Sequence, residues 1–151
     1  MIRLAVTVLC GALFTLHASA QDAALDRLAA ARQRWQGVAH ADYGYSYQKY
    51  CECNRDIPPV TYVTIANGRI ERVYHVHSDS DREVPARAGS LDLYYTIDDL
   101  FAKLETAFAG GITVRAEYDP RLGYPTSIFI DYSPTITGEE LDLRQIRVEL
   151  P

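Results

Sequence analysis

The sequence predicts an α+β domain in which an antiparallel sheet of about six strands carries two helices on one face. Apolar residues recur at helical spacing in two stretches, which begin after Asp22 and after Thr96. Other stretches alternate with a period of two, as the half-buried strands of an antiparallel sheet do. Between two of these stretches, Asn67-Gly68 indicates a two-residue hairpin. The expected order of elements is αβββαβββ.

Residues 1–20 have the layout of a secretory signal peptide. Arg3 gives a positively charged start, residues 4–16 form a mostly apolar run, and an A-x-A cleavage site ends at Ala20. The apolar run is short for a membrane-spanning helix of about 20 residues. We therefore expect cleavage after Ala20, a single exported domain of residues 21–151 in the periplasm or outside the cell, and no membrane span after cleavage.

The charge balance argues against a nucleic-acid partner. The chain has 15 Lys and Arg against 20 Asp and Glu, a net charge of −5. Loss of residues 1–20 removes one arginine and no acid, which leaves −6. A mildly acidic domain without a basic cluster binds polyanions poorly. A protein or a small molecule is the expected partner.

The first helix is expected to begin at Asp22, which can cap it, and to end near Gly37. Its apolar stripe consists of Leu25, Leu28, Ala31 and Trp35. We expect Trp35 to anchor this helix in a core that also contains Ile70, Leu100, Phe101, Leu104 and Ile130.

Tyrosines alternate along the stretch that follows, at Tyr43, Tyr45 and Tyr47. These three side chains share one face of a strand. Such a stripe is either a stacking surface for sugars, bases or a partner, or the half-buried face of a strand, because tyrosine packs well on a pleated sheet. We favour packing, and keep Tyr45, together with Tyr62 on the next strand, as candidate binding residues.

The predicted hairpin joins residues 60–66 to residues 69–77. If Ala66 faces Arg69, one face of the hairpin carries Val63, Ile65, Ile70, Tyr74 and Val76, and the other carries Val60, Tyr62, Thr64, Glu71, Val73, His75 and His77. We expect the first set to face the core, with Arg72 as its one misfit, and the two histidines to lie on the wetter face. The polar segment 78–89 is expected to be a loop.

The second half repeats a helix followed by three strands. Thr96 to Asp99 resembles a capping box, and Gly110-Gly111 is expected to end the helix. The three strands are expected at residues 112–118, 126–132 and 141–150, with a bulge near Arg144-Gln145 in the last. We expect the Tyr124–Pro125 bond to be trans.

Four motifs occur in a fixed order along the chain. They are Tyr-x-Tyr before Cys51-x-Cys53, a strand with Asn67-Gly68, Thr96-Ile97-Asp98-Asp99-Leu100-Phe101, and Tyr118-Asp119-Pro120-x-x-Gly123-Tyr124-Pro125-x-x-Ile128-x-Ile130-Asp131. The pattern resembles the bacterial exported family known as domain of unknown function 6174, over most of residues 35–150. The resemblance implies export and a small α+β domain, and implies no activity, ligand or catalytic residue.

Cys51 and Cys53 are the two cysteines that remain after cleavage, and an exported protein meets an oxidising compartment. In a straight strand their Cβ atoms would lie about 6–7 Å apart, whereas a disulfide needs about 3.5–4.5 Å. The strand therefore has to end or buckle at Glu52 if the bond forms. A structural disulfide is the favoured interpretation; a redox-active pair and a thiolate metal site are the alternatives.

His75 and His77 would project from one strand face, as two ligands of a metal do, and Asp79 and Asp81 could add carboxylates. Zinc or copper would be the metal in that interpretation. We favour the alternative, a polar strand end that enters a charged loop, and we expect no cofactor.

The sequence contains no G-x-S-x-G, phosphate-loop, G-x-G-x-x-G or H-E-x-x-H motif. We therefore favour a non-enzymatic binding or interaction module, which would use the helix-free sheet face or the 78–89 loop. The alternative is a thiol-redox or metal-binding protein that uses the Cys51-x-Cys53 corner with His75 and His77.

Overall fold

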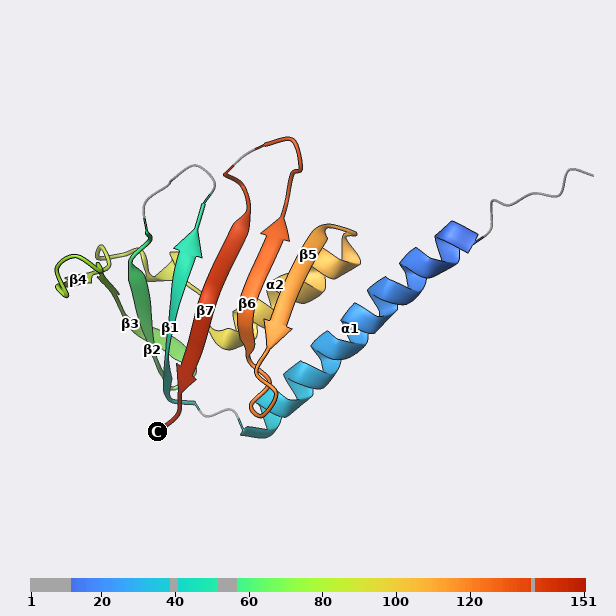
Figure 1. The fold of residues 1–151 in the computed structure, drawn as a ribbon. Helices are drawn as coiled ribbons and strands as arrows, with labels where there is room; N and C mark the ends of the chain where they lie inside the picture. The colour runs from blue at the N-terminus through green and yellow to red at the C-terminus, as the bar shows by residue number, and fades with distance from the viewer. Residues whose placement is uncertain (1–11, 39–40, 52–56, 137) are drawn as a thin grey trace, which may run out of the picture.

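In a computed structural model, residues 12–38, 41–51, 57–136 and 138–151 are described, and they form one antiparallel sheet with two helices (Figure 1). The elements are α1 (Ala12–Val38), β1 (Tyr43–Tyr50), β2 (Val60–Ala66), β3 (Arg69–Val76), β4 (Glu83–Pro85), a 3-10 turn (Leu91–Leu93), α2 (Ile97–Ala109), β5 (Thr113–Tyr118), β6 (Pro125–Asp131) and β7 (Leu141–Glu149). The predicted α+β class is confirmed, and the predicted order αβββαβββ holds except for one additional strand before α2.

The sheet has seven strands in the order β4-β3-β2-β1-β7-β6-β5, one more than expected. The additional strand, β4, lies within the segment 78–89 that was predicted to be a loop. It pairs with β3 at the edge of the sheet. A strand of three residues is too short to show a period of two in the sequence, so its pairing arises from tertiary structure.

Strand β7, the last in the chain, lies beside β1, the first. It thereby joins the β1–β4 half of the sheet to the β5–β6 half. The pairing of β1 with β7 shifts register between Ser46 and Gln48, and Gln145 has a φ of 55° there. The predicted bulge near Arg144-Gln145 is confirmed.

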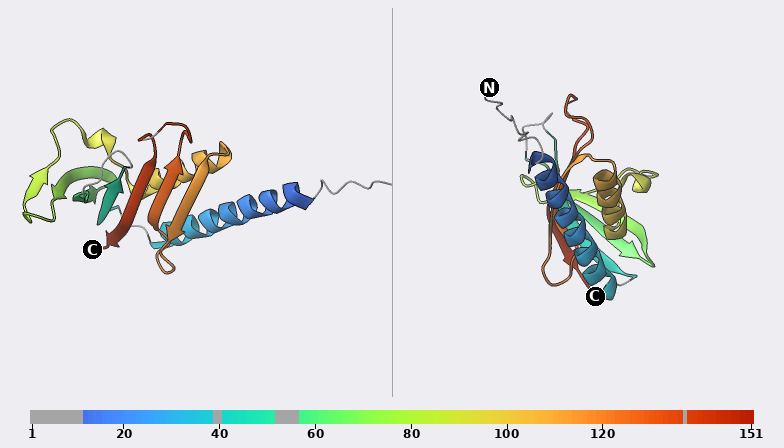
Figure 2. Two further views of the ribbon diagram at one scale, coloured as in Figure 1. Left: turned by 45° about the horizontal axis from the view of Figure 1, so that its top comes forward. Right: turned by 90° about the vertical axis from the view of Figure 1, so that its right-hand side faces the viewer.

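Helix α2 lies across one face of the sheet, and α1 runs at an angle beside β5 and extends beyond the sheet (Figures 1 and 2). The two helices pack on each other, and Arg32 of α1 forms an ion pair with Glu105 of α2. Helix α1 begins at Ala12, so Asp22 lies inside it and not at its start. No Gly or Pro interrupts residues 12–36, which explains the longer helix.

The predicted cleavage site after Ala20 falls inside α1. The fold does not test whether the chain is cleaved there, so cleavage stays a prediction. Residues 1–11 lie outside the described part of the chain. Within the described part, neither helix has the length and apolar character needed to cross a membrane.

The core lies between the helices and the sheet. Five of the six predicted core residues are completely buried: Trp35, Leu100, Phe101, Leu104 and Ile130. The Trp35 indole makes edge-on contacts with the rings of Tyr43 and Tyr124, at centroid distances of 5.3 and 6.3 Å. Ile70 is only half-buried and packs against the core from outside, whereas its partner Ile65 on β2, one strand further from the sheet edge, is buried.

Helix α2 begins with the predicted capping box. The Thr96 hydroxyl accepts a hydrogen bond from the Asp99 N–H at 3.0 Å, and the Asp99 carboxylate accepts one from the Thr96 N–H at 2.8 Å. Gly111, with a φ of 66°, follows the helix as predicted. The Tyr124–Pro125 bond is trans, as expected.

The β2–β3 hairpin has the predicted turn but not the predicted faces. Asn67 and Gly68 have φ values of 52° and 72°, as a type I′ turn requires. Ala66 faces Arg69, but Thr64 pairs with Arg72, so Glu71 is the extra residue of a bulge.

One extra residue exchanges the two faces for the rest of a strand. The faces predicted for residues 72–76 are therefore wrong, including that of Arg72, which pairs with Thr64 on the helix-free side. Val73 is buried opposite Val63, and His75 lies opposite Thr61 on the helix-covered side.

Candidate binding surface on the helix-free sheet face

The face of the sheet that the helices leave open carries side chains aligned across several strands. One row crosses β3, β2, β1 and β7 and consists of Tyr74, Tyr62, Ser46 and Arg147. A second row crosses β1, β7, β6 and β5 and consists of Tyr50, Asp142, Phe129 and Arg115. Both rows result from strand register, because cross-strand partners share one face of a sheet.

Tyr62 and Tyr74 form a parallel stack, with ring centroids 4.9 Å apart and planes 5° apart. The Arg72 guanidinium lies 4.6 Å from the Tyr74 ring centroid and also forms a 2.8 Å ion pair with Glu83 of β4. The bulge at Glu71 is what places Tyr74 beside Tyr62. Arg72 and Tyr74 form the first of three contacts on this face between a guanidinium and an aromatic ring, which we call guanidinium–ring units.

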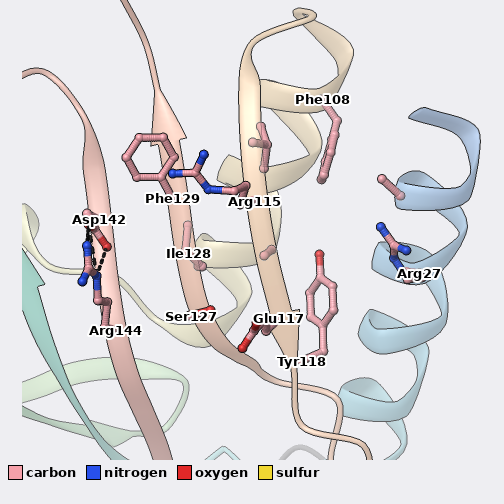
Figure 3. A pocket seen from close by; sticks show the side chains of 13 residues that line it. Arg27, Phe108, Arg115, Glu117, Tyr118, Ser127, Ile128, Phe129, Asp142 and Arg144 are labelled. Atoms are coloured by element: carbon pink, nitrogen blue, oxygen red, sulfur yellow. Dashed lines mark hydrogen bonds and ion pairs between the residues drawn. The ribbon is translucent and has the colours of Figure 1, made fainter. Parts of the chain in front are cut away.

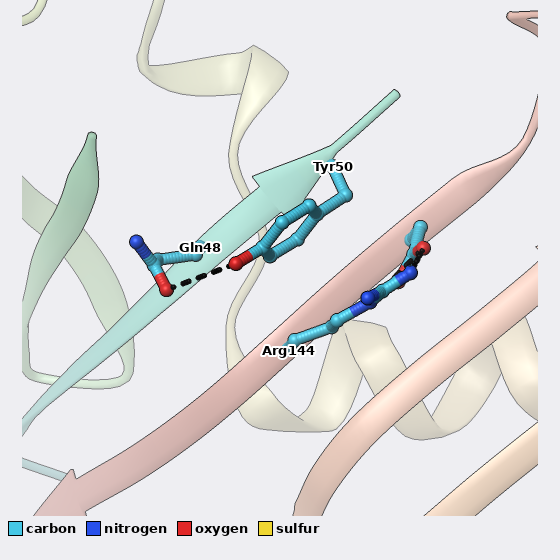
Figure 4. A network of polar contacts seen from close by, with 4 residues as sticks. Gln48, Tyr50 and Arg144 are labelled. Atoms are coloured by element: carbon cyan, nitrogen blue, oxygen red, sulfur yellow. Dashed lines mark hydrogen bonds and ion pairs between the residues drawn. The ribbon is translucent and has the colours of Figure 1, made fainter. Parts of the chain in front are cut away.

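The second unit lies at the centre of the sheet (Figure 4). The Arg144 guanidinium stands 4.3 Å from the Tyr50 ring centroid and binds the buried Asp142 carboxylate through Nη2 at 2.6 Å and Nε at 2.9 Å. The hydrogen bond to Asp142 raises the pKa of Arg144. The Tyr50 hydroxyl donates to Gln48 Oε1 at 3.4 Å, and Gln48 Nε2 donates to the Pro58 carbonyl at 2.9 Å.

The third unit lies toward the β5 edge, where the Arg115 guanidinium stands 4.1 Å from the Phe129 ring centroid. The three arginines of these units, Arg72, Arg115 and Arg144, are all exposed. Each contact between a guanidinium and a ring contributes about 0.5–1 kcal/mol at an exposed site. The helix-free face therefore presents flat rings with cations already held over them.

Of the two candidate binding tyrosines, only Tyr62 lies on this face. Tyr45 is 3% exposed, and its hydroxyl donates to the Tyr95 carbonyl. Burial raises the pKa of Tyr45 and raises that of Tyr43 to about 12. The Tyr43 hydroxyl accepts from the Ile97 N–H at 3.0 Å. The tyrosine stripe of β1 thus packs under the helices, in agreement with the favoured interpretation.

His75 lies on the helix-covered side, next to a cavity of about 280 Å³. Its Nδ1 is 3.0 Å from the Thr61 hydroxyl and its Nε2 is 3.1 Å from the Tyr94 hydroxyl. Burial, and then the charge of His77, lower the pKa of His75. Both ring nitrogens therefore have protein partners.

His77 and Asp79, the other proposed metal ligands, are exposed beyond the end of β3. Among the described residues, no group of three or more His, Cys, Asp or Glu is arranged to hold a metal. The zinc or copper site thus stays a prediction that this geometry does not favour.

Cys51 follows β1 directly, as the predicted end of that strand requires. Cys53 lies outside the described residues, so the Cys51–Cys53 disulfide stays a prediction.

A pocket of about 470 Å³ lies at the β5 side of the sheet, and its lining includes residues of α1 as well as Arg115, Phe129, Asp142 and Arg144 of the helix-free face (Figure 3). Arg27 of α1, Phe108 of α2 and Tyr118 of β5 line it. These residues are far apart in the sequence and share no motif, so no sequence pattern points to this pocket.

Residues 27–149 match the model of a family described as "Family of unknown function (DUF6174)". The chain belongs to the DUF6174 family. The DUF6174 match includes α2 and every strand of the sheet, and therefore the whole helix-free face. No curated protein and no solved structure matches the chain.

Proposed function

We propose that this DUF6174 protein is an exported, non-enzymatic binding module that holds a protein partner on its helix-free face. The observation that carries this proposal is the set of three guanidinium–ring units, with separations of 4.1, 4.3 and 4.6 Å. The signal-peptide layout of residues 1–20 supports export.

Tyrosine and arginine are the residues that most often form binding hot spots at protein interfaces. An arginine that already rests on a ring loses less side-chain freedom when a partner arrives. The parallel Tyr62–Tyr74 stack adds flat apolar area with hydroxyls at its rim. Composition and pre-organisation thus both favour a protein partner.

Site-specific photo-cross-linking tests the proposal. A photoreactive phenylalanine analogue would replace Tyr62 or Phe129 on the helix-free face, and Gln33, exposed on α1, as the control. We expect one and the same protein to cross-link from both positions on the face and not from Gln33. Replacement of both Arg72 and Arg144 by Ala should lower the yield and weaken binding of the purified partner about ten-fold or more.

Equal cross-linking from Gln33, or none from Tyr62 and Phe129, would reject the helix-free face as the binding surface. An unchanged affinity in the double arginine variant would show that the guanidinium–ring units do not contribute.

A further inference from the structure

Strand β5 forms one edge of the sheet, with β6 as its neighbour on the inner side. Helix α1 runs beside this edge but packs on α2, and the described residues show no comparable packing of α1 along β5 (Figures 1 and 2). None of the backbone hydrogen bonds in the described loops, turns and caps reaches residues 113–117. The outward N–H and C=O groups of β5 are therefore open to a further strand.

Part of the pocket of about 470 Å³ lies between β5 and α1, and the rest is lined by residues of the helix-free face, among them Glu117 and Arg144 (Figure 3). Ala24, Phe108, Val114 and Ala116 give it an apolar lining next to the open backbone edge. A strand that adds to β5 would lie about 4.8 Å from it, on the side of β5 that faces α1.

One polar atom in this groove is unsatisfied. The Tyr118 hydroxyl is buried and has no hydrogen-bond partner within the described part of the chain. Figure 3 shows this hydroxyl pointing along the groove between β5 and α1, with Arg27 on the helix opposite. Burial raises the pKa of Tyr118 to about 12, and the Arg27 charge lowers it in part. None of the ion pairs among the described residues involves Arg27.

We propose that an extended acidic peptide segment of a partner protein adds to β5 in this groove, with one of its carboxylates bound by the Tyr118 hydroxyl and the Arg27 guanidinium. Both groups donate hydrogen bonds, so the occupant has to supply an acceptor, and a carboxylate is the strongest acceptor for a guanidinium. Main-chain hydrogen bonds to the strand edge would supply affinity, and the groove would select the side chains.

The test uses a display library of random ten-residue peptides, selected on the purified full protein. We expect the selected peptides to share an aspartate or glutamate inside a β-forming run. The best peptide should bind at least about ten-fold more weakly to Arg27→Glu and to Tyr118→Phe, because each variant removes a donor to a charged group. Arg34→Glu makes the same charge change on an exposed part of α1 outside the groove and should bind normally.

Tyr118→Phe separates binding from folding. Its lost hydroxyl has no partner in the described part of the chain, so the variant should unfold at the same temperature as the parent or higher. Hydrogen exchange should also show that the peptide protects amides of residues 113–118 in the parent protein.

Three results would overturn the proposal: failure to select any acidic peptide, binding to Arg27→Glu and Tyr118→Phe as tight as to the parent protein, or no protection of the β5 amides. So would a dimer in solution that Arg27→Glu dissociates, because a second copy would then be the occupant. Arg72→Ala on the helix-free face changes a residue that does not line this pocket and should bind the peptide normally, so this test fails or succeeds independently of the proposed function.

Discussion

Asp142 is a carboxylate buried at a sheet face, and its ion pair makes that position tolerable. Its side chain is 10% exposed, and Arg144 covers it with two nitrogens. A buried charge that loses its partner bears the whole cost of its desolvation. Arg144 thus has two roles, as partner of Asp142 and as the cation over Tyr50.

Arg144→Ala should lower the free energy of unfolding by about 1–2 kcal/mol. This loss is smaller than for a fully buried ion pair, because solvent screens the exposed arginine. The matched control is Arg147→Ala on the same strand, since Arg147 is exposed and belongs to none of the described ion pairs. Its loss should change stability by less than about 0.5 kcal/mol. Urea titration measures both; equal effects would show that the pair with Asp142 is not stabilising.

His75 should make stability depend on pH. Its pKa is lower in the folded protein than in the unfolded chain, because burial and the charge of His77 both disfavour the protonated ring. Lys49 lines the same cavity. The unfolded chain therefore binds the proton more readily, so the contribution of His75 to stability is present above pH ~6.5 and is lost as pH falls below it.

The free energy of unfolding should thus fall between about pH 7 and pH 5, and His75→Gln should flatten that slope. Urea titrations at several pH values compare the variant with the parent protein. An identical slope in both would show that other groups cause the pH dependence.

At the scale of elements, Gly123 fixes how the β5–β6 turn meets α1. Its φ is +88°, and a Cβ there would lie 2.2 Å from the Ala31 carbonyl oxygen and 2.9 Å from the Trp35 nitrogen. Asp119 shapes the same turn by accepting from the Leu122 N–H at 2.6 Å. The turn and the helix can touch only because residue 123 has no side chain.

Gly123→Ala should cost more than about 3 kcal/mol, because backbone strain and a clash with the helix backbone add together. Gly89→Ala is the control, since Gly89 has a similar φ of +80° and a Cβ added to it would meet nothing within 4 Å. Backbone strain alone should destabilise that variant, by about 1 kcal/mol. Thermal unfolding of the two variants gives the comparison, and similar losses would mean that the helix moves away at little cost.

Local signals predicted elements well and register less well. The capping box at Thr96, the Asn67-Gly68 turn and the bulge near Gln145 depend on neighbouring residues alone, and each is present. The bulge at Glu71 was missed. An arginine expected on the core face, Arg72, was the one sign in the sequence that the register shifts there. A slip of one residue there leaves the strand itself intact and moves His75 to the other side of the sheet.

At the scale of the whole molecule, the candidate sites depend on contacts between distant segments. Arg144 meets Tyr50 because β7 lies beside β1, and Arg27 faces Tyr118 because α1 passes the β5 edge. No local pattern encodes either neighbour. The sequence therefore predicts which residue types are available, whereas the strand order determines which of them share a surface.

Export and the cysteine corner can be tested together on the exported protein. Cleavage after Ala20 leaves Cys51 and Cys53 as the two cysteines, one residue apart in an oxidising compartment. The intact mass should therefore correspond to residues 21–151 less two hydrogens. A mass that still includes residues 1–20 would contradict the signal peptide.

The Cys51–Cys53 bond, if formed, closes a very small ring, so its loss should cost little. The double Cys→Ser variant should lose about 1–2 kcal/mol and keep its fold, because the entropy gained from so short a loop is small. Glu52 between the cysteines disfavours a thiolate, and Cys51 follows a strand, whereas the thiol of a redox catalyst would open a helix. Thiol titration of the exported protein should find no free thiol. Two free thiols with stoichiometric zinc or copper would instead establish a metal site. Efficient disulfide exchange with scrambled substrates would establish a redox role.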